Sequence, residues 1–217
     1  MQQFTSILLT SVLFNGVTKA QLAPLLTAAT PTQKVFAAGK RIWQAGEKVT
    51  TFGLVCAGQV QIVKENVQGN RMIVATIKPG DIFGEAYIYA ATGGLPVSVD
   101  ASQAAIILFF TPQRLLLLTQ LPSGQQVVSN LLQILAQKSL LLNQKVEILG
   151  QRRIADKVLT YLRWEQRRQQ TNPILLPYNR QEMADFLGVE RSALSATLSE
   201  MKQATVIDYH KNQFTLL

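Results

Sequence analysis

An arginine surrounded by small side chains is the pattern with the clearest chemistry in this chain of 217 residues. The small residues that follow Arg191 are Ser192, Ala193, Ser195 and Ala196. A guanidinium can donate two hydrogen bonds to O6 and N7 of one guanine, and small neighbours let a helix lie deep in the major groove of DNA. The pattern therefore predicts that this segment reads bases through Arg191.

The segment around this arginine is expected to form two short helices joined by a turn. Asn179 suits the N-cap of the first helix, and Glu182, three residues on, completes a capping box. Gly188 supplies a left-handed residue at the end of that helix, and Glu190 begins the second one. The apolar residues expected to face inward are Met183, Phe186, Leu187, Leu194, Leu198 and Met201. Such a pair is typical of the helix-turn-helix.

Two flanking elements support this interpretation. Residues 154–169 are expected to form an amphipathic helix, with Val158, Leu159 and Leu162 facing inward. Residues 206–209 and 213–216 are expected to pair as two strands beside the second helix, in the position called a wing. An ordinary helical hairpin is the alternative; the spacing of glycine and apolar residues and the strand pair favour the helix-turn-helix.

Cysteine and histidine, which carry much metal-binding and nucleophilic chemistry, occur once each. With Cys56 as the one thiol, the chain can form no internal disulfide, zinc finger or cysteine-ligated iron–sulfur cluster. With His210 as the one imidazole, a multi-histidine metal site and a convincing Ser-His-Asp set are excluded. The sequence therefore predicts no catalytic residue, no metal and no cofactor.

The composition is that of a globular protein, with 47% hydrophobic and 16% charged residues. Lys and Arg outnumber Asp and Glu by 21 to 13, which suits a polyanionic partner such as nucleic acid; a merely basic soluble protein is the alternative, and charge alone does not decide between them. Residues 1–4 lack the positive charge of a signal peptide, and the most apolar run, residues 104–110, is too short to cross a bilayer. We therefore expect a cytoplasmic protein without a membrane partner.

The first 110 residues are predicted to form a small antiparallel sandwich or barrel beside short helices. Strands punctuated by glycine are expected at residues 40–44, 52–56, 59–64 and 71–78, with a hairpin turn at 66–70 and a strand buried on both faces at 104–110. Helices are expected at residues 5–14, 19–29 and 113–120. The fold class is therefore α+β.

A long helix is predicted over residues 125–149, which contain neither proline nor glycine. Four apolar residues fall seven apart, namely Val128, Leu135, Leu142 and Leu149, and Leu131, Leu132 and Val146 lie beside them. This heptad spacing predicts a homodimer, because a 25-residue helix of ~37 Å exceeds the thickness of a small domain. A core helix of a monomer is the alternative. We expect domains at residues 1–124 and 151–217, joined by a dimerisation helix at 125–150.

The order of β-roll, long helix, helix-turn-helix and wing resembles the Crp/Fnr family of bacterial transcription regulators over essentially the whole chain. The N-terminal half matches at Gly46-Glu47-Lys48, at Ala57-Gly58 and at residues 78–85, a run that resembles the phosphate-binding cassette of cyclic-nucleotide-binding domains. The resemblance implies an effector-sensing roll, dimers formed through residues 125–149, an inverted-repeat operator in double-stranded DNA, and RNA polymerase as a partner. It implies base-facing positions for Glu190, Arg191, Ser192, Ser195 and Ala196, and phosphate contacts for Asn179, Arg180 and Gln181.

The chain departs from the cyclic-AMP-binding members at the roll. Those members carry Arg-Ser ten and eleven residues after the cassette glutamate, where this chain has Leu95 and Pro96. A phosphodiester without that arginine loses a bidentate contact, so we predict no binding of cyclic AMP. The remaining choices are an apolar or weakly anionic effector, and a packed roll without one. The residues expected to line the pocket are Phe83, Gly84, Glu85, Ala86, Tyr87, Leu95, Pro96, Val97, Leu142 and Asn143.

The chain departs from the family elsewhere too. Ser192 and Ala196 replace the glutamate and the second arginine of other members, so specificity is expected to rest on Arg191 and DNA shape. The cysteine cluster of redox-sensing members has no counterpart before Cys56, and a haem ligand cannot come from His210 in the wing. A cupin enzyme would need two or three histidines in the roll. A cyclic-nucleotide module without DNA binding is opposed by the helix-turn-helix.

Overall fold

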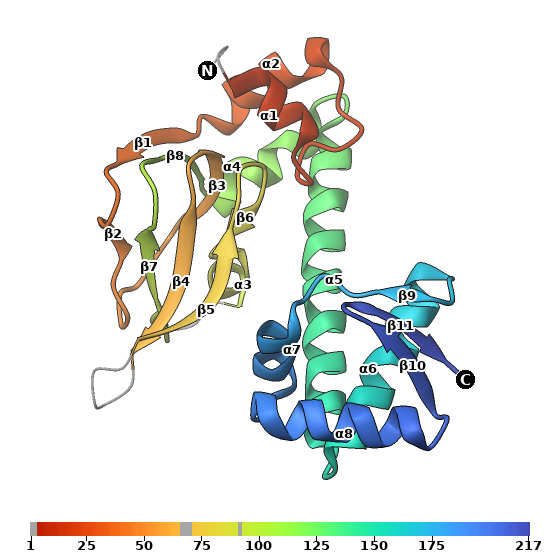
Figure 1. The fold of residues 1–217 in the computed structure, drawn as a ribbon. Coiled ribbons are helices and arrows are strands. Elements are labelled where there is room, and N and C mark those ends of the chain that lie inside the picture. The colour runs from red at the N-terminus through yellow and green to blue at the C-terminus, as the bar shows by residue number, and fades with distance from the viewer. Residues whose placement is uncertain (1–3, 66–70, 91–92) are drawn as a thin grey trace. The chain divides into compact units, whose positions relative to one another are not determined.

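The computed structural model describes residues 4–65, 71–90 and 93–217 (Figure 1). The chain divides into two compact units, residues 1–137 and 138–217. The boundary falls inside the long helix α5 (Gly124–Gly150), so that its first half belongs to one unit and its second half to the other. The predicted hairpin turn at residues 66–70 lies outside the described residues.

Two four-stranded antiparallel sheets make up the roll of the first unit, in the orders β1-β8-β3-β6 and β2-β7-β4-β5. The strands are β1 (Thr32–Phe36), β2 (Arg41–Trp43), β3 (Phe52–Ala57), β4 (Val60–Glu65), β5 (Arg71–Ile77), β6 (Ile82–Phe83), β7 (Ser98–Ala101) and β8 (Ala105–Phe110). This confirms the predicted antiparallel roll. The sequence analysis missed β1, β6 and β7, because β1 is mostly exposed and polar and the other two are only two and four residues long.

Strand β8 confirms the expectation of a strand buried on both faces. Ile107 and Phe109 belong to the core between the two sheets, where Phe109 contacts the rings of Trp43 and Phe83. Leu108 and Phe110 belong to a second core, formed with the N-terminal helices and the start of α5. Strand β8 therefore contributes side chains both to the core between the two sheets and to the core between the roll and the helices.

The helices of the first unit are α1 (Thr5–Thr10), α2 (Lys19–Ala29), α3 (Glu85–Tyr89), α4 (Pro112–Leu117) and the 3₁₀ turn η2 (Leu118–Gln120). The expected helix over residues 5–14 was wrong in length, since α1 ends at Thr10. The hydroxyl of Ser11 donates to the carbonyl of Leu8 and accepts from the amide of Phe14. Such a side chain competes for the backbone groups that would continue the helix.

The second unit contains a small core formed by residues of four helices and of a three-stranded sheet ordered β10-β11-β9 (Figure 1). Its elements are the second half of α5, α6 (Ile154–Gln169), β9 (Ile174–Leu175), α7 (Arg180–Leu187), α8 (Arg191–Gln203), β10 (Ile207–His210) and β11 (Gln213–Leu216). The predicted helix-turn-helix and wing are confirmed; β9 was missed. In the described part of the chain, no helix is both long and apolar enough to cross a membrane.

Candidate DNA-binding and effector sites

Helix α7 begins and ends with the local contacts that the sequence predicted. The Asn179 side chain accepts a hydrogen bond from the amide of Glu182 at 2.9 Å, and the Glu182 carboxylate accepts from the amide of Asn179 at 2.8 Å. At the other end Gly188 has φ +63°, and the amide of Val189 donates to the carbonyl of Ala184. These caps fix where α7 stops and α8 starts.

Helix α8 separates a buried face from an exposed one. The buried residues are Leu194, Leu198 and Met201, which pack in the core of the second unit. Arg191, Ser192 and Ala196 are exposed and Ser195 is half-buried, while Glu190 is the exposed N-cap residue. The side chains expected to face bases therefore share one accessible surface, called here the α8 outer face (residues 191, 192, 195 and 196).

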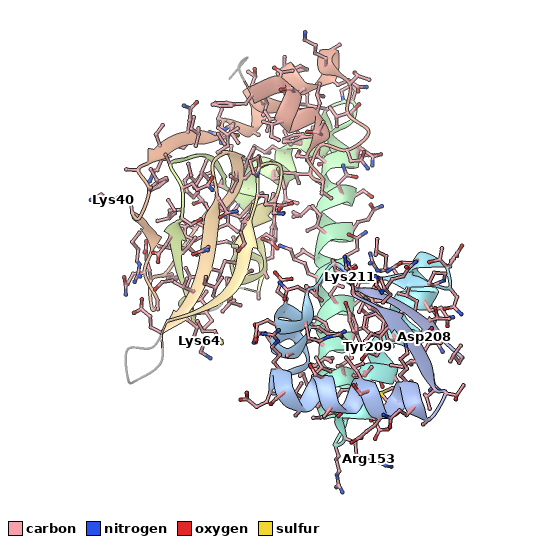
Figure 2. The ribbon with its side chains drawn as sticks, viewed as in Figure 1. Lys40, Lys64, Arg153, Asp208, Tyr209 and Lys211 are labelled. Atoms are coloured by element: carbon pink, nitrogen blue, oxygen red, sulfur yellow. The ribbon has the colours of Figure 1, made fainter. Side chains whose placement is uncertain are left out.

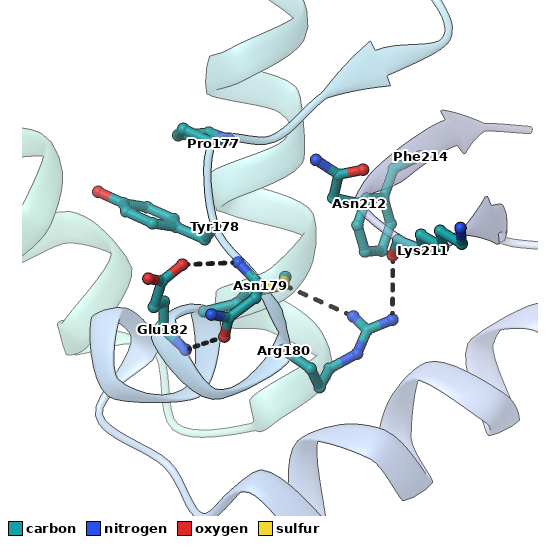
Figure 3. Close-up of a pocket in the computed structure, with 9 residues that line it drawn as sticks. Pro177, Tyr178, Asn179, Arg180, Glu182, Lys211, Asn212 and Phe214 are labelled. Carbon is teal, nitrogen blue, oxygen red and sulfur yellow. Dashed lines mark hydrogen bonds between the residues drawn. The ribbon is translucent and has the colours of Figure 1, made fainter.

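Arg180, at the first turn of α7, lies against the wing (Figure 3). Its guanidinium is 5.1 Å from the ring centroid of Tyr209 and 5.5 Å from that of Phe214. It also donates to the backbone carbonyl of Lys211 at 3.3 Å and contacts the sulfur of Met183. Arg180 thus connects α7 to the wing, and its guanidinium lies next to the backbone of Lys211.

A depression of about 450 Å³ lies between the start of α7 and the wing. Arg180 and Lys211 both line it, and Figure 2 shows Lys211 on the wing beside Tyr209. Sequence reasoning missed Lys211, because it predicted the strand pair of the wing but did not place the turn between the two strands beside α7. Asn179 also lines the depression, whereas the side-chain amide of Gln181 is bonded to Asp185 at 2.9 Å.

Two lysines that the sequence analysis did not single out hold the C-terminal end of α7. Lys145, on α5, donates to the carbonyl of Phe186, and Lys157, on α6, donates to the carbonyl of Leu187 at 3.1 Å. Cations at the last carbonyls of a helix compensate its dipole. Each lysine is separated from its partner by 30 or more residues, which is why local sequence patterns gave no signal.

The cassette turn of the roll is formed by backbone contacts and a glycine. The carboxylate of Asp81 accepts from the amide of Lys78, and the amide of Asp81 donates to the carbonyl of Lys78. Gly84 has φ +83°, and a Cβ there would lie 2.6 Å from the ring of Trp43. The turn therefore has the predicted sequence and a compact geometry, and Glu85 behind it is only 2% exposed.

The predicted pocket residues are divided between core and surface. Leu95 is 3% exposed and packs in the core between the two sheets, with Phe83 beside it in the same core. The backbone of Leu95 forms two hydrogen bonds with the motif Gly46-Glu47. Val97 is buried, Tyr87 and Gly84 are half-buried, and Ala86 and Pro96 are exposed.

Leu142 and Asn143 lie on the half of α5 that belongs to the second unit, and both are exposed. Of the predicted pocket residues, Phe83 and Leu95 therefore share one core in the roll, whereas the two α5 residues belong to the other unit.

Arg41, on strand β2 of the roll, uses its guanidinium for contacts within the fold. The guanidinium of Arg41 donates to Asp100 at 2.7 and 3.3 Å, to Ser98 at 3.1 Å and to Glu65 at 3.0 Å. Asp100 is buried, so this arginine pins β2 to β7 and compensates a carboxylate taken out of water. The contacts also hold the pKa of Arg41 above its ordinary value.

The one cysteine and the one histidine of the chain differ in exposure. Burial raises the pKa of the Cys56 thiol to about 11, while His210 is exposed on β10. Across residues 4–65, 71–90 and 93–217, no group of three or more His, Cys, Asp and Glu side chains is placed to hold a metal ion.

Comparison with known proteins agrees with this architecture. Residues 33–120 match the family model of the cyclic nucleotide-binding domain, and residues 152–217 match that of the Crp-like helix-turn-helix domain. The cyclic AMP receptor protein of Thermus thermophilus is 23% identical over 197 residues, which cover 91% of this chain and 88% of that relative.

Solved structures show the same fold. The catabolite activator protein of Thermus thermophilus is 22% identical with a TM-score of 0.50, and the match covers 95% of this chain and 94% of that one. CprK complexed with OCPA is 14% identical with a TM-score of 0.65, covering 90% and 88%. The c-di-GMP responsive regulator CLP of Xanthomonas campestris is 16% identical with a TM-score of 0.54, covering 89% and 98%. With both of its domains matched in this order, the chain belongs to the Crp/Fnr family of bacterial transcription regulators.

Proposed function

We propose that the protein is a homodimeric regulator that reads an inverted repeat through the α8 outer face, with Arg191 as its principal base-reading residue. The observation that carries this proposal is the exposure of Arg191 at the start of a capped helix whose opposite face is buried. Its small neighbours leave room for close approach to a major groove. Arg180 and Lys211 supply cations for flanking phosphates.

Dimerisation is supported by the exposed apolar face of α5. Leu132, Leu142 and Val146 are 62%, 66% and 70% exposed, and Leu149 continues the same face. Together with Val128, Leu135 and Ser139 these positions alternate at spacings of four and three, as helices that pair require. We call this surface the α5 seam. Two copies joined along it carry two reading helices, so half-sites are expected about 10 bp apart, centre to centre.

The roll is proposed not to bind cyclic AMP. Leu95 occupies the position of the phosphate-binding arginine and is packed in the core, and Pro96 beside it has no amide N–H to donate. The related proteins are a receptor for cyclic AMP, a regulator responsive to c-di-GMP and a protein complexed with OCPA, so the fold alone does not determine which small molecule is bound here. Calorimetric titration with cyclic AMP should give no micromolar binding.

Selection from randomised duplexes tests the DNA-reading role. The wild-type protein should enrich an inverted repeat, and Arg191→Ala should relax the preference at one position per half-site, at a cost of ~1–3 kcal/mol per contact. Gln203→Ala, at the exposed C-terminal end of the same helix, is the matched control and should leave the motif unchanged. Enrichment of no inverted repeat, or an unchanged motif with Arg191→Ala, would show the assignment to be wrong.

A further inference from the structure

A second cavity lies within the unit formed by residues 138–217, between α5, α6 and α7. It is called here the α5–α7 cavity and has a volume of about 390 Å³. Small-molecule sites in proteins occupy about 300–1,000 Å³, so this cavity has the size of a ligand of one or two rings. Neither the helix-turn-helix nor the cassette turn accounts for it.

Four of the twelve residues that line the cavity are aromatic. The ring of Phe186, on α7, lies 4.8 Å from that of Tyr161 and 5.2 Å from that of Tyr178. Trp164 stacks beside Tyr161 at 6.3 Å with an interplanar angle of 22°. Rings at these distances prefer offset-stacked and edge-to-face contacts, which a further planar ring can extend. The wall therefore favours a flat aromatic ligand.

The charges around the cavity favour an anion. Arg168 is paired with the buried carboxylate of Glu165 at 2.7 Å, so these two charges compensate each other. The ammonium of Lys145 lies 3.7 Å from the ring centroid of Phe186 and donates one hydrogen bond to the carbonyl of that residue. Within the described part of the chain it forms no ion pair. One of its three N–H donors is used by that carbonyl, and the other two have no hydrogen-bond acceptor among the described residues, although the side chain is half-buried.

A neighbouring polar atom also lacks a partner. The amide oxygen of Gln144 is buried without a hydrogen bond to any described residue, and Gln144 lines the cavity next to Lys145. A buried acceptor of this kind is normally satisfied. A ligand that carries a hydroxyl or N–H group beside its ring would complete it.

We propose that the α5–α7 cavity binds an aromatic carboxylate, with its ring against Phe186, Tyr161 and Trp164 and its carboxylate on Lys145. Such a ligand touches the long helix, α6 and the end of α7 at once. It therefore holds α7 against both neighbours, and α7 carries the turn into the reading helix. If the proposed DNA-reading function holds, occupancy raises DNA affinity, and DNA raises affinity for the ligand by the same factor.

The α5–α7 cavity and the α5 seam meet at Leu142, which lines the cavity and belongs to the seam. Leu141, Lys145 and Ile148 line the cavity, whereas Val146 and Leu149 belong to the seam. At about 100° per residue, the centres of these two groups are about 100° apart around the helix axis. The part of the cavity lined by Lys145 and Ile148 therefore lies on a different face of α5 from the seam, and a second copy of the chain on the seam borders the cavity at Leu142.

Calorimetric titration of the full-length protein with 2-naphthoate tests the proposal without DNA. We expect one site per chain, and binding at least fivefold weaker for the uncharged 2-naphthamide, because the ammonium contributes a charge-assisted bond only to the carboxylate. Lys145→Met should weaken 2-naphthoate binding about tenfold and leave 2-naphthamide binding unchanged, whereas Lys145→Arg should retain most of the affinity.

Lys157→Met is the matched control, because Lys157 donates to the end of α7 in the same way but does not line the cavity. It should leave 2-naphthoate binding unchanged. No binding at millimolar concentration, equal affinity for the two compounds, or equal losses in Lys145→Met and Lys157→Met would overturn the proposal. Because the selection from duplexes is a separate measurement, failure of DNA reading and failure of this site are distinguishable.

Discussion

The helix-turn-helix and the cassette turn are both built around a glycine in the left-handed conformation, but the residues that follow the two glycines differ in environment. After Gly188, Val189 packs on the core, but Glu190, Arg191 and Ser192 at the start of α8 are exposed. After Gly84, Glu85 is buried, and Leu95, ten residues further on, fills the core. A turn can thus persist in both units while the side chains beside it serve binding in one and packing in the other.

If exposed residues serve binding, the largest loss of DNA affinity should come from substitutions on the α5 seam, the exposed apolar face of the long helix. Leu135→Glu with Leu142→Glu places uncompensated charge on the seam and should give monomers. A monomer loses the second half-site and with it the effective-concentration gain of bivalent binding, so DNA affinity should fall about 10²–10⁴-fold. Analytical ultracentrifugation and gel shifts measure both effects. Leu116→Glu, an exposed leucine on α4, is the control; an unchanged sedimentation coefficient in the double variant would contradict the dimer.

The two glycines provide a direct test of which turn is the more constrained. In Gly84→Ala the new methyl carbon would lie 2.6 Å from the ring of Trp43, which is packed against Phe83 and Phe109. Strain and overpacking together should cost about 3 kcal/mol of the free energy of unfolding. In Gly188→Ala the new carbon meets only the end of the Leu149 side chain at 3.3 Å, so about 1 kcal/mol is expected. Urea unfolding of the two variants should preserve this order; a larger loss in Gly188→Ala would contradict it.

The same contrast explains what the sequence could and could not predict. The capping box at Asn179, the turn at Gly188 and the buried face of α8 are local patterns, so the helix-turn-helix followed from spacing alone. The contacts of Lys145 and Lys157 join residues 30 or more positions apart, and no local pattern encodes them. Helix α1 was predicted too long because the competing hydroxyl of Ser11 was overlooked.

The roll shows a different limit of sequence reasoning. The resemblance of residues 78–85 to the phosphate-binding cassette pointed to position 95 as part of a pocket, and the loss of arginine there was visible in the sequence. That Leu95 would be packed between the sheets depends on three aromatic rings contributed by β2, β6 and β8, which only the sheet topology brings together.

Arginines from the two units sharpen the comparison further. Arg41→Met removes the ion pair and two hydrogen bonds that Arg41 makes with the buried carboxylate of Asp100, which should cost about 3 kcal/mol of the free energy of unfolding of the roll. Arg191→Met should leave the unfolding transition within about 0.5 kcal/mol of the wild type, because the side chain is exposed. Denaturant unfolding followed by circular dichroism measures both. Equal effects of the two substitutions on stability would contradict the assignment of a structural role to Arg41 and a binding role to Arg191.

The smallest expected effect concerns the phosphate contacts beside the wing. Lys211→Gln removes a cation that lines the depression next to Arg180, while the carbonyl of Lys211 remains to accept from that arginine. Loss of one phosphate contact should weaken binding to all sequences alike and reduce the slope of log K against log salt by about one. Lys64→Gln, an exposed lysine on the roll, serves as the control and should leave the slope unchanged.

Arg180→Ala should lower the slope by a similar amount. It should in addition destabilise the second unit, because the guanidinium of Arg180 also stacks on Tyr209 and Phe214. Salt titrations on operator and random duplexes separate the two variants: a loss confined to the operator would mean that this depression reads sequence and does not simply hold the backbone.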